Sequence, residues 1–275
     1  MRGARATQAR PKGATVGVVG IALGLVLAGC STAASTVTPP AQAPGKPYTY
    51  VAIGGSESVG NDANDPVRQA FTVLLEHELP PQTVFYDLGA TGATATDVLT
   101  HQVGAARSLH PNLVTVWVGL RDLEEGASTE LFGSQLRQII APLRKERATV
   151  LVANLEPITL APAYQTCLGH PPPSPDSRSF HCFVDHFFPQ NSIPPVAVTT
   201  AAVAAYNVEV AEVARSTGAV LVDVNHAMTR PVSGDAGSLF SNDDFDLSTS
   251  GHALAAALFI AAWRSNGGSA TRSSR

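Results

Sequence analysis

The feature that most constrains the fold is a regular alternation of short apolar runs with helix-like segments between residues 48 and 264. Five runs are rich in aliphatic and β-branched residues and are predicted as strands: 48–53, 83–88, 113–118, 149–153 and 219–224. Run 113–118 is continuously apolar, which is typical of a strand covered on both faces. Because parallel strands need long crossover connections, this order predicts a three-layer α/β/α sandwich with a mostly parallel five-stranded sheet.

Amphipathic segments between the runs predict the covering helices. Residues 65 and 66 (Asp-Pro) form a helix start, and Val67, Phe71, Leu74 and Leu75 are predicted to line one face behind it. Further helices are predicted at 96–108, around 136–143, at 198–217 and at 251–264. In such sheets ligands bind at the carboxyl ends of the strands, so the loops there are the candidate site.

The N-terminus has the composition of an export signal. Arg2, Arg5, Arg10 and Lys12 precede fifteen uncharged residues, 14–28. That run is shorter than the roughly 20 residues that a membrane span needs, but it suits the apolar part of a secretory signal. The sequence thus predicts an exported protein.

Residues 27–30 (Leu-Ala-Gly-Cys) resemble the lipobox of bacterial lipoproteins. The resemblance implies that 1–29 is a signal peptide, that Cys30 carries a lipid, and that the protein is anchored to the outer face of the bacterial cell membrane. An uncleaved signal anchor is the alternative. Residues 30–47, rich in Pro, Ala, Ser and Thr, are predicted as a flexible tether, and 265–275 as a disordered tail.

Charge excludes one class of partner. After residue 30 the chain has 14 Lys and Arg against 22 Asp and Glu, a net charge of −8. A nucleic-acid-binding domain would carry a basic stripe instead, so we predict no nucleic-acid partner. The sequence does not determine an oligomeric state.

A proline-rich insertion, 155–196, interrupts the alternation. Residues 156–195 hold nine of the 20 prolines, which argues against regular structure there. Cys167 and Cys182 lie among His170, His181 and His186, a set that also suits zinc. Outside the cytoplasm a Cys167–Cys182 disulfide is the preferred interpretation, and no metal or cofactor is predicted.

Four sequence blocks follow predicted strands or precede the last helix: Gly54-Gly55-Ser56-Glu57-Ser58, the segment 87–94 with Thr91-Gly92-Ala93-Thr94, Gly119-Leu120-Arg121-Asp122, and the segment 243–252. In this order they resemble the SGNH (GDSL) hydrolase family over 48–264. The resemblance implies an esterase in which Ser56 is the nucleophile, Gly92 donates to the oxyanion, and Asp243 is the acid of the catalytic triad.

Three positions depart from the family pattern. Gly55 replaces its usual aspartate, Arg121 replaces the oxyanion asparagine, and Asp246 stands where the catalytic histidine is expected. A carboxylate has an ordinary pKa of about 3.9 against about 6.5 for imidazole, so Asp246 is expected to be the poorer base. We hypothesise an Arg121–Asp246 ion pair across the site; independent drift of the two positions is the alternative.

Other histidines are candidates for the missing base. His252, at the start of the last helix, is expected to cap or pack, and His181 or His186 would need the insertion to fold over the site. Two functions follow: an exported esterase acting on acyl or acetyl esters of lipids or cell-wall sugars, or a non-catalytic relative that binds a glycan, a lipid or an envelope partner. A purely structural lipoprotein fits the sequence without being specifically predicted by it.

Overall fold

The computed structural model describes residues 46–168, 188, 192–230, 235–242 and 244–269. They belong to a compact unit that begins at Pro44. The predicted signal peptide, Cys30, nearly all of the tether, most of the insertion with Cys182, and the last six residues lie outside the described residues.

The sheet has the predicted five strands, and every pairing is parallel. They are β1 (Thr49–Gly54), β2 (Val84–Asp87), β3 (Leu113–Trp117), β4 (Thr149–Ala153) and β5 (Val220–Val222). Their order is β2-β1-β3-β4-β5. The chain adds β2 on one side of β1 and then crosses to the other side to form β3, so the strand order switches between β1 and β3. In a doubly wound sheet the crevice at such a switch point is where ligands bind.

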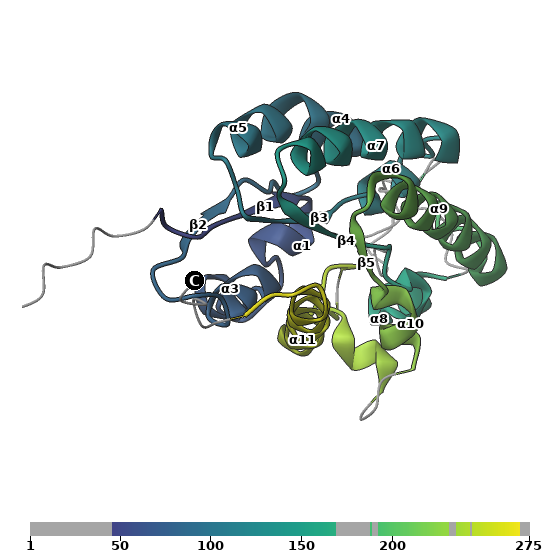
Figure 1. The fold of residues 1–275 in the computed structure, drawn as a ribbon. Helices are drawn as coiled ribbons and strands as arrows, with labels where there is room; N and C mark the ends of the chain where they lie inside the picture. Colours follow the sequence, from purple (N-terminus) through teal and green to yellow (C-terminus); the bar gives the residue numbers. More distant parts are fainter. Residues whose placement is uncertain (1–45, 169–187, 189–191, 231–234, 243, 270–275) are drawn as a thin grey trace, which may run out of the picture. The chain divides into compact units, whose positions relative to one another are not determined.

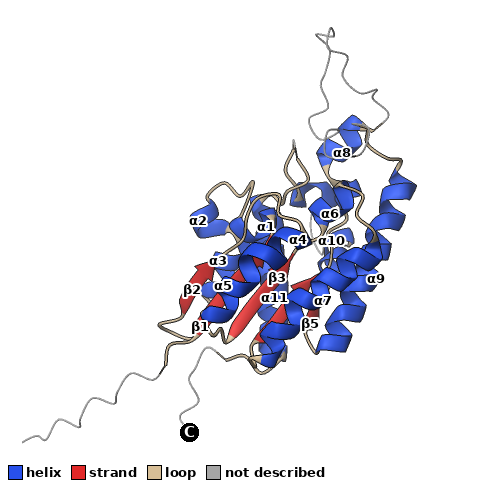
Figure 2. Ribbon diagram, turned by 90° about the horizontal axis from the view of Figure 1, so that it is seen from above, coloured by secondary structure: helices blue, strands red, loops and turns tan. Residues whose placement is uncertain are grey.

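Helices cover both faces of the sheet (Figures 1 and 2). On one face, α3 (Phe71–Glu76) packs against α11 (Thr249–Ser265). On the other lie α5 (Val103–Ser108) and α7 (Thr129–Lys145), and α7 packs along α9 (Val196–Thr217). The three-layer α/β/α prediction is confirmed.

Shorter helices occupy the connections. They are α1 (Ser56–Val59), α2 (Pro66–Gln69), α4 (Ala95–Asp97), α6 (Leu120–Glu124), α8 (Pro162–Cys167), α10 (Val224–Thr229), the 3₁₀ turns η2 (Ile158–Leu160) and η5 (Ala236–Leu239), and the π-helical turn η1 (Val98–Gln102). α1 and α6 directly follow β1 and β3, which places both at the switch point.

The core explains why the central strands are apolar throughout. Every residue of β1 and β3 is buried, because each strand has a helical layer on both sides. Phe71, Trp117 and Phe259 form an aromatic cluster with ring centroids 4.7–5.9 Å apart, in which Phe71 stacks on Phe259 and meets Trp117 edge-on. This aromatic cluster fixes α3 and α11 against the end of β3.

Some local predictions were wrong. The helix predicted from residue 66 breaks at Ala70, so Val67 lies on α2 and is 77% exposed instead of facing the core. The helix predicted over 96–108 is present, but its middle turn is the π turn η1. Regular structure was not expected after 155, yet η2 and α8 form there, with Pro162 in the first turn of α8, where a proline is tolerated.

Among the described residues, one helix is long and apolar enough to be considered as a membrane span, namely α9. Its buried residues include Val203, Tyr206, Val210 and Val213, which recur on the face that packs against the domain. Ring stacking of Tyr206 on Phe132 of α7, with centroids 4.8 Å apart, ties that face to the neighbouring helix. This pattern is that of a core helix of the α/β sandwich.

The last residue of β1 must be a glycine, Gly54, because the ends of β1 and β3 approach closely at this point. Its φ is +146°, and a Cβ there would lie 2.0 Å from the Trp117 carbonyl oxygen. We expect Gly54→Ala to lower the free energy of unfolding by about 3 kcal/mol or more, measured by urea denaturation. Gly104→Ala is the matched control, because its Cβ would enter open space on a helix and should be neutral or slightly stabilising. Equal effects would contradict this explanation.

Candidate active site

The site lies at the carboxyl ends of β1 and β3, as the topology predicts. A cavity of about 380 Å³ opens there, and its lining includes Ser56, Gly92, Arg121 and Asp246. Four residues singled out from separate sequence blocks therefore surround one cavity. Asp243, the predicted triad acid, lies outside the described residues.

Ser56 begins α1 directly after the end of β1. The turn before it is held by Gln102, whose buried side chain accepts from the Gly54 N–H at 2.8 Å and donates to the Gly54 carbonyl at 3.1 Å. Gln102 is the last residue of the π turn η1, a kind of turn that is frequent at functional sites. This residue's role could not be predicted from the sequence, since a π turn leaves no recognisable periodicity.

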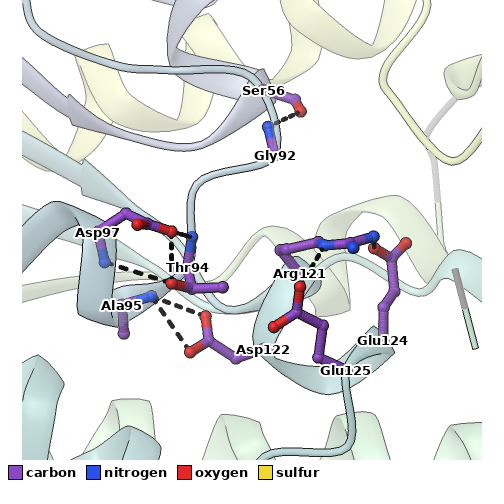
Figure 3. A network of polar contacts seen from close by, with 9 residues as sticks. All are labelled: Ser56, Gly92, Thr94, Ala95, Asp97, Arg121, Asp122, Glu124 and Glu125. Atoms are coloured by element: carbon purple, nitrogen blue, oxygen red, sulfur yellow. Dashed lines mark hydrogen bonds and ion pairs between the residues drawn. The ribbon is translucent and has the colours of Figure 1, made fainter. Parts of the chain in front are cut away.

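Gly92 faces Ser56 across the cavity, and its N–H donates to Ser56 Oγ at 3.2 Å (Figure 3). Its φ is +69°, and a Cβ there would meet no heavy atom within 4 Å, so the backbone of this loop faces open space. The N–H thus lies directly beside the hydroxyl, a position that suits an oxyanion donor.

Hydrogen bonds from Thr94 and Ala95 to two carboxylates hold the loop that carries Gly92 in place (Figure 3). Thr94 caps α4 in a capping box with Asp97. Both carboxylate oxygens of Asp122 accept from the Ala95 N–H, at 2.9 and 3.1 Å. Burial raises the pKa of Asp122 to about 6, while its bonds from backbone N–H groups lower it. Asp122 thus positions the loop that carries Gly92.

Arg121 projects from α6 and lines the cavity, but the hypothesised pair with Asp246 is not formed. Among the described residues, its ion pairs run to Glu125 (Nε to Oε1, 2.9 Å) and to Glu124 (Nη1 to Oε2, 3.5 Å), as Figure 3 shows. The i,i+3 and i,i+4 spacing on one short helix makes these carboxylates the nearer partners. The sequence hypothesis missed this local competition.

Asp246 lies within reach of the nucleophile. Asn61 Nδ2 donates to Asp246 Oδ2 at 3.1 Å, and Ser56 lines the same cavity as this carboxylate. Burial raises the pKa of Asp246 to about 6; Asn61 and the nearby Ser56 hydroxyl lower it, and the charges of Asp244 and Asp62 raise it. Asp246 is therefore a stronger base than its residue type suggested.

Asn61 is a site residue that the sequence analysis missed. Its Oδ1 accepts from Thr91 Oγ1 at 3.0 Å, which fixes its amide toward Asp246, and its carbonyl accepts from His252 Nε2 at 3.0 Å. His252 Nδ1 in turn accepts from the Phe71 N–H at 3.4 Å. Because both ring nitrogens of this fully buried histidine are bonded to backbone groups, the packing role predicted for His252 is confirmed.

Buried carboxyl groups gather under the cavity, and the sequence analysis also missed these. Glu57, Glu124 and Glu156 are 4%, 5% and 1% exposed. A Cβ on Gly55 would lie 3.4 Å from Glu57 Oε2, so an aspartate at position 55 would bring a second carboxylate against Glu57. The glycine is therefore compatible with Glu57 in a way that the family's usual residue is not.

No group of His, Cys, Asp or Glu in the part of the chain that the structure describes is arranged to hold a metal ion. His170, His181, His186 and Cys182 lie outside that part, so the choice between a disulfide and a metal in the insertion stays a prediction. Cys167 ends α8 and is buried. The proposal that a histidine of the insertion supplies a base is likewise untested.

The comparison with known families decides the assignment. The sequence profile of the GDSL-like lipase/acylhydrolase family matches residues 52–254. The chain belongs to this family. The match includes the second half of β1, all of β2 to β5 and all of the residues described around the cavity, so the GDSL-like fold and the candidate site come from the same stretch of chain.

Solved structures of GDSL-like and related hydrolases share the fold. TesA is 14% identical, with a TM-score of 0.57 over 79% of this chain and 98% of that one. The lipase/acylhydrolase from Enterococcus faecalis is 16% identical (TM-score 0.54, 82% and 100% covered), and phospholipase A1 from Streptomyces albidoflavus NA297 is 18% identical (TM-score 0.54, 80% and 99% covered). At these identities the likeness concerns the fold alone. Among curated proteins, none matches the chain.

The buried carboxyl groups make stability depend on pH. Burial raises the pKa of Glu124 to about 8 and that of Glu156 to about 7, and Asp122 and Asp246 titrate near 6. Each holds its proton more tightly when folded than when unfolded, so its contribution is present at low pH and is lost as pH rises through the folded pKa.

We therefore expect the free energy of unfolding to fall by about 2 kcal/mol or more between pH 6 and pH 9, measured by urea denaturation at fixed ionic strength. His252 acts in the opposite direction, since burial lowers its pKa, but that contribution is confined to pH values below its ordinary pKa of about 6.5. Stability that stays level or rises over this range would contradict the assignment of these groups as buried acids.

Proposed function

We propose that the protein is a serine esterase that hydrolyses small acyl esters, with Asp246 in place of the usual histidine base. The observation that carries the proposal is the position of the Ser56 hydroxyl, which accepts from the Gly92 N–H at 3.2 Å and lines the same cavity as the Asp246 carboxylate. A serine needs an adjacent base and a preorganised oxyanion donor, and these two groups are of the required kinds.

The basicity of Asp246 supports the proposal. A general base is most effective when its pKa lies near the operating pH, and burial brings that of Asp246 to about 6, close to imidazole. The objection that a carboxylate is too weak applies to an exposed aspartate near 3.9. Asn61, held by Thr91, keeps one carboxylate oxygen in place.

In the proposed reaction, Asp246 takes the Ser56 proton while Ser56 Oγ attacks the ester carbonyl. The carbonyl oxygen becomes negative and is stabilised by the Gly92 N–H and by the positive charge of Arg121 at the cavity wall. Protonated Asp246 then returns the proton to the departing alkoxide, which leaves as an alcohol and gives an acyl-serine. Asp246 then takes a proton from a water molecule that attacks the acyl carbon. The bond from that carbon to Ser56 Oγ breaks, Asp246 returns the proton to Ser56 Oγ, and the acid is released.

Glu124 and Glu125 hold the Arg121 side chain in place at the cavity wall. The cavity, about 380 Å³ with several carboxyl groups in its lining, suits a short acyl group better than a long hydrocarbon chain. The test is to assay the full chain with p-nitrophenyl acetate, butyrate and decanoate. We expect hydrolysis that declines with acyl length; hydrolysis of none of the three would overturn the proposal.

We further propose that the protein is exported and anchored through a lipidated Cys30. The basic start, the uncharged run 14–28 and the residues Leu27-Ala28-Gly29-Cys30 support this proposal. The tether would then hold the domain away from the membrane surface. Membrane fractionation of bacteria expressing the chain and its Cys30→Ala variant tests it: the variant should leave the membrane fraction or keep its signal peptide, and an unchanged mature lipoprotein would contradict it.

A further inference from the structure

Cationic side chains gather at the end of the domain opposite the cavity. At that end the strands begin and the helices that cover the sheet finish. Arg144, in the last turn of α7, donates from Nη1 to the carbonyl oxygen of Ala148, just before β4, at 2.6 Å. Arg107 and Arg264, near the ends of α5 and α11, are further cations of this end. The end of the domain farthest from the nucleophile is therefore rich in positive charge.

A groove of about 450 Å³ lies at this end, lined by residues of α7 and of the last turn of α9. Its polar lining consists of three cations and two hydroxyl groups, and no described carboxylate lines it: Arg137, Arg144, Lys145, Ser216 and Thr217. The three cations share one face of α7, because they recur at a spacing of seven and eight residues. Such a lining suits a phosphate group.

We call Arg137, Arg144, Lys145 and Arg147 the basic end; all but Arg144 are exposed. Their charges are not offset by nearby acids. On the neighbouring helices, Arg107, Arg215 and Arg264 each form an ion pair with a glutamate, whereas no ion pair joins the basic end to a carboxylate of the described chain. The four charges are therefore available to an anionic partner.

The helix dipole explains only part of this cluster. A cation in the last turn of a helix is stabilised by the partial negative charge of the helix end, which accounts for Arg144 and Lys145. Arg137 lies two turns before the end of α7, and Arg147 follows the helix. The dipole acts only within the last turn, so it gives no reason for these two residues.

The charge is polarised along the domain. The chain after residue 30 has a net charge of −8, so a basic surface is not expected from composition. Carboxylates instead gather at the other end, where Asp62, Glu125 and Glu130 are exposed and Asp244 and Asp246 line the cavity. An anionic surface would therefore attract one end of the domain and repel the other.

The predicted tether joins the domain at the cationic end. Lys46, the first described residue, precedes β1 by three positions. Trp263 of α11 donates its Nε1–H to the hydroxyl of Tyr48 at 3.2 Å, so the last helix also finishes beside the start of β1. A chain anchored through residue 30 would thus present this end to the membrane.

We propose that the basic end binds the phosphate headgroups of anionic phospholipids and directs the cavity away from the membrane. A membrane surface that contains anionic lipids attracts clusters of Lys and Arg, and a guanidinium group binds phosphate through paired hydrogen bonds. The attraction does not require a lipid on Cys30. A lipid anchor would add to it by holding the domain close to the surface.

This orientation narrows the substrate class, a consequence that rests on the proposed esterase function. The Ser56 hydroxyl would face away from the bilayer, and the carboxylates around it would be repelled by the lipid headgroups. Esters carried by polar molecules outside the bilayer, such as acylated sugars, would then be within reach. The acyl esters of the membrane lipids would not.

Vesicle binding of the double variant Arg137→Gln/Lys145→Gln tests the surface. The full chain is sedimented with phosphatidylcholine vesicles that contain or lack phosphatidylglycerol. We expect the additional binding caused by phosphatidylglycerol to be about tenfold weaker in the variant at low salt, and the difference to vanish at high salt. The cations near the N-terminus contribute equally in both chains. Glutamine has a helix propensity close to that of the residues replaced, so α7 should stay intact.

Arg68→Gln/Arg230→Gln is the matched control, because it removes the same charge elsewhere. Arg68 lies on α2 and pairs with Asp65, and Arg230 ends α10 and lines another cavity with Asp223. This variant should bind the vesicles as wild type does. Equal losses in the two double variants would overturn the proposal, and so would binding that phosphatidylglycerol does not increase.

Hydrogen exchange tests the orientation without any variant or activity. With vesicles that contain phosphatidylglycerol, amides in 144–149 and 214–219 should exchange more slowly, and those in 61–65 and 244–249 around the cavity should not change. Slower exchange around the cavity instead would overturn the proposal even if esters are hydrolysed. Protection of the basic end in a chain that hydrolyses no ester would support the docking surface and count against the esterase function alone.

Discussion

Ser56→Ala is expected to reduce ester hydrolysis by about 10³-fold or more, to the background of the buffer. The alanine removes the only atom that becomes acylated, while the Gly92 N–H and the rest of the cavity stay in place. The measurement is kcat/KM for p-nitrophenyl acetate at pH 8, where Asp246 is ionised. Folding is checked by the urea midpoint, which should change little because Ser56 Oγ makes its contacts at the open cavity.

The matched control for this variant is Ser134→Ala, on the exposed surface of α7. It should keep wild-type activity. If Ser56→Ala and wild type hydrolyse the ester equally, the activity does not come from this serine. The second sequence interpretation, a cavity that binds a ligand without turnover, would then become the better account.

Asp246→Asn should lower kcat/KM by about 10²- to 10⁴-fold, because an amide of the same shape cannot accept the Ser56 proton. The wild-type profile should rise with pH through about 6, since the base works only when ionised and burial raises the pKa of Asp246 to that value. The asparagine can still accept from Asn61 Nδ2, so the fold of this variant should be intact.

Asp246→His is the companion variant. Imidazole is the base that the family normally places here, and its ordinary pKa of about 6.5 lies close to that of Asp246. We expect it to retain activity to within about tenfold of wild type. Loss of activity in both variants, with intact folding, would mean that Asp246 acts through its charge rather than as a base.

The sequence predicted the fold well because its signals were local and repeated. Five apolar runs with crossover helices leave few possible topologies, and the structure has the five strands in parallel. The errors came from breaks that no periodicity marks. Ala70, between α2 and α3, and the π turn η1 interrupt segments whose apolar residues read as continuous helices.

The positions of site residues were predicted correctly where a family motif contains them. The interactions that these residues make were not predicted. Ser56, Gly92, Arg121 and Asp246 do line one cavity. Arg121, however, finds its ion-pair partners within its own helix, one turn away. Sequence spacing within α6 could have suggested that competition.

The pKa of Asp246 could not be read from the sequence, because it depends on burial and on neighbours far along the chain. Asn61 lies 185 residues before Asp246, and Asp62 follows Asn61 directly, yet both act on the same carboxylate. Neither belongs to a motif that the sequence analysis used. Long-range electrostatics of this kind appear only when the strand ends are brought together.

The most direct test of the central claim is covalent labelling of Ser56. The full chain is incubated with a p-nitrophenyl alkylphosphonate from pH 5 to pH 8, and the adduct is located by mass spectrometry of peptides. A nucleophile activated by Asp246 should carry the phosphonyl group on Ser56, at a rate that rises through about pH 6 and is greatly reduced in Asp246→Asn. No adduct on Ser56, or labelling equally fast in Asp246→Asn, would contradict the account.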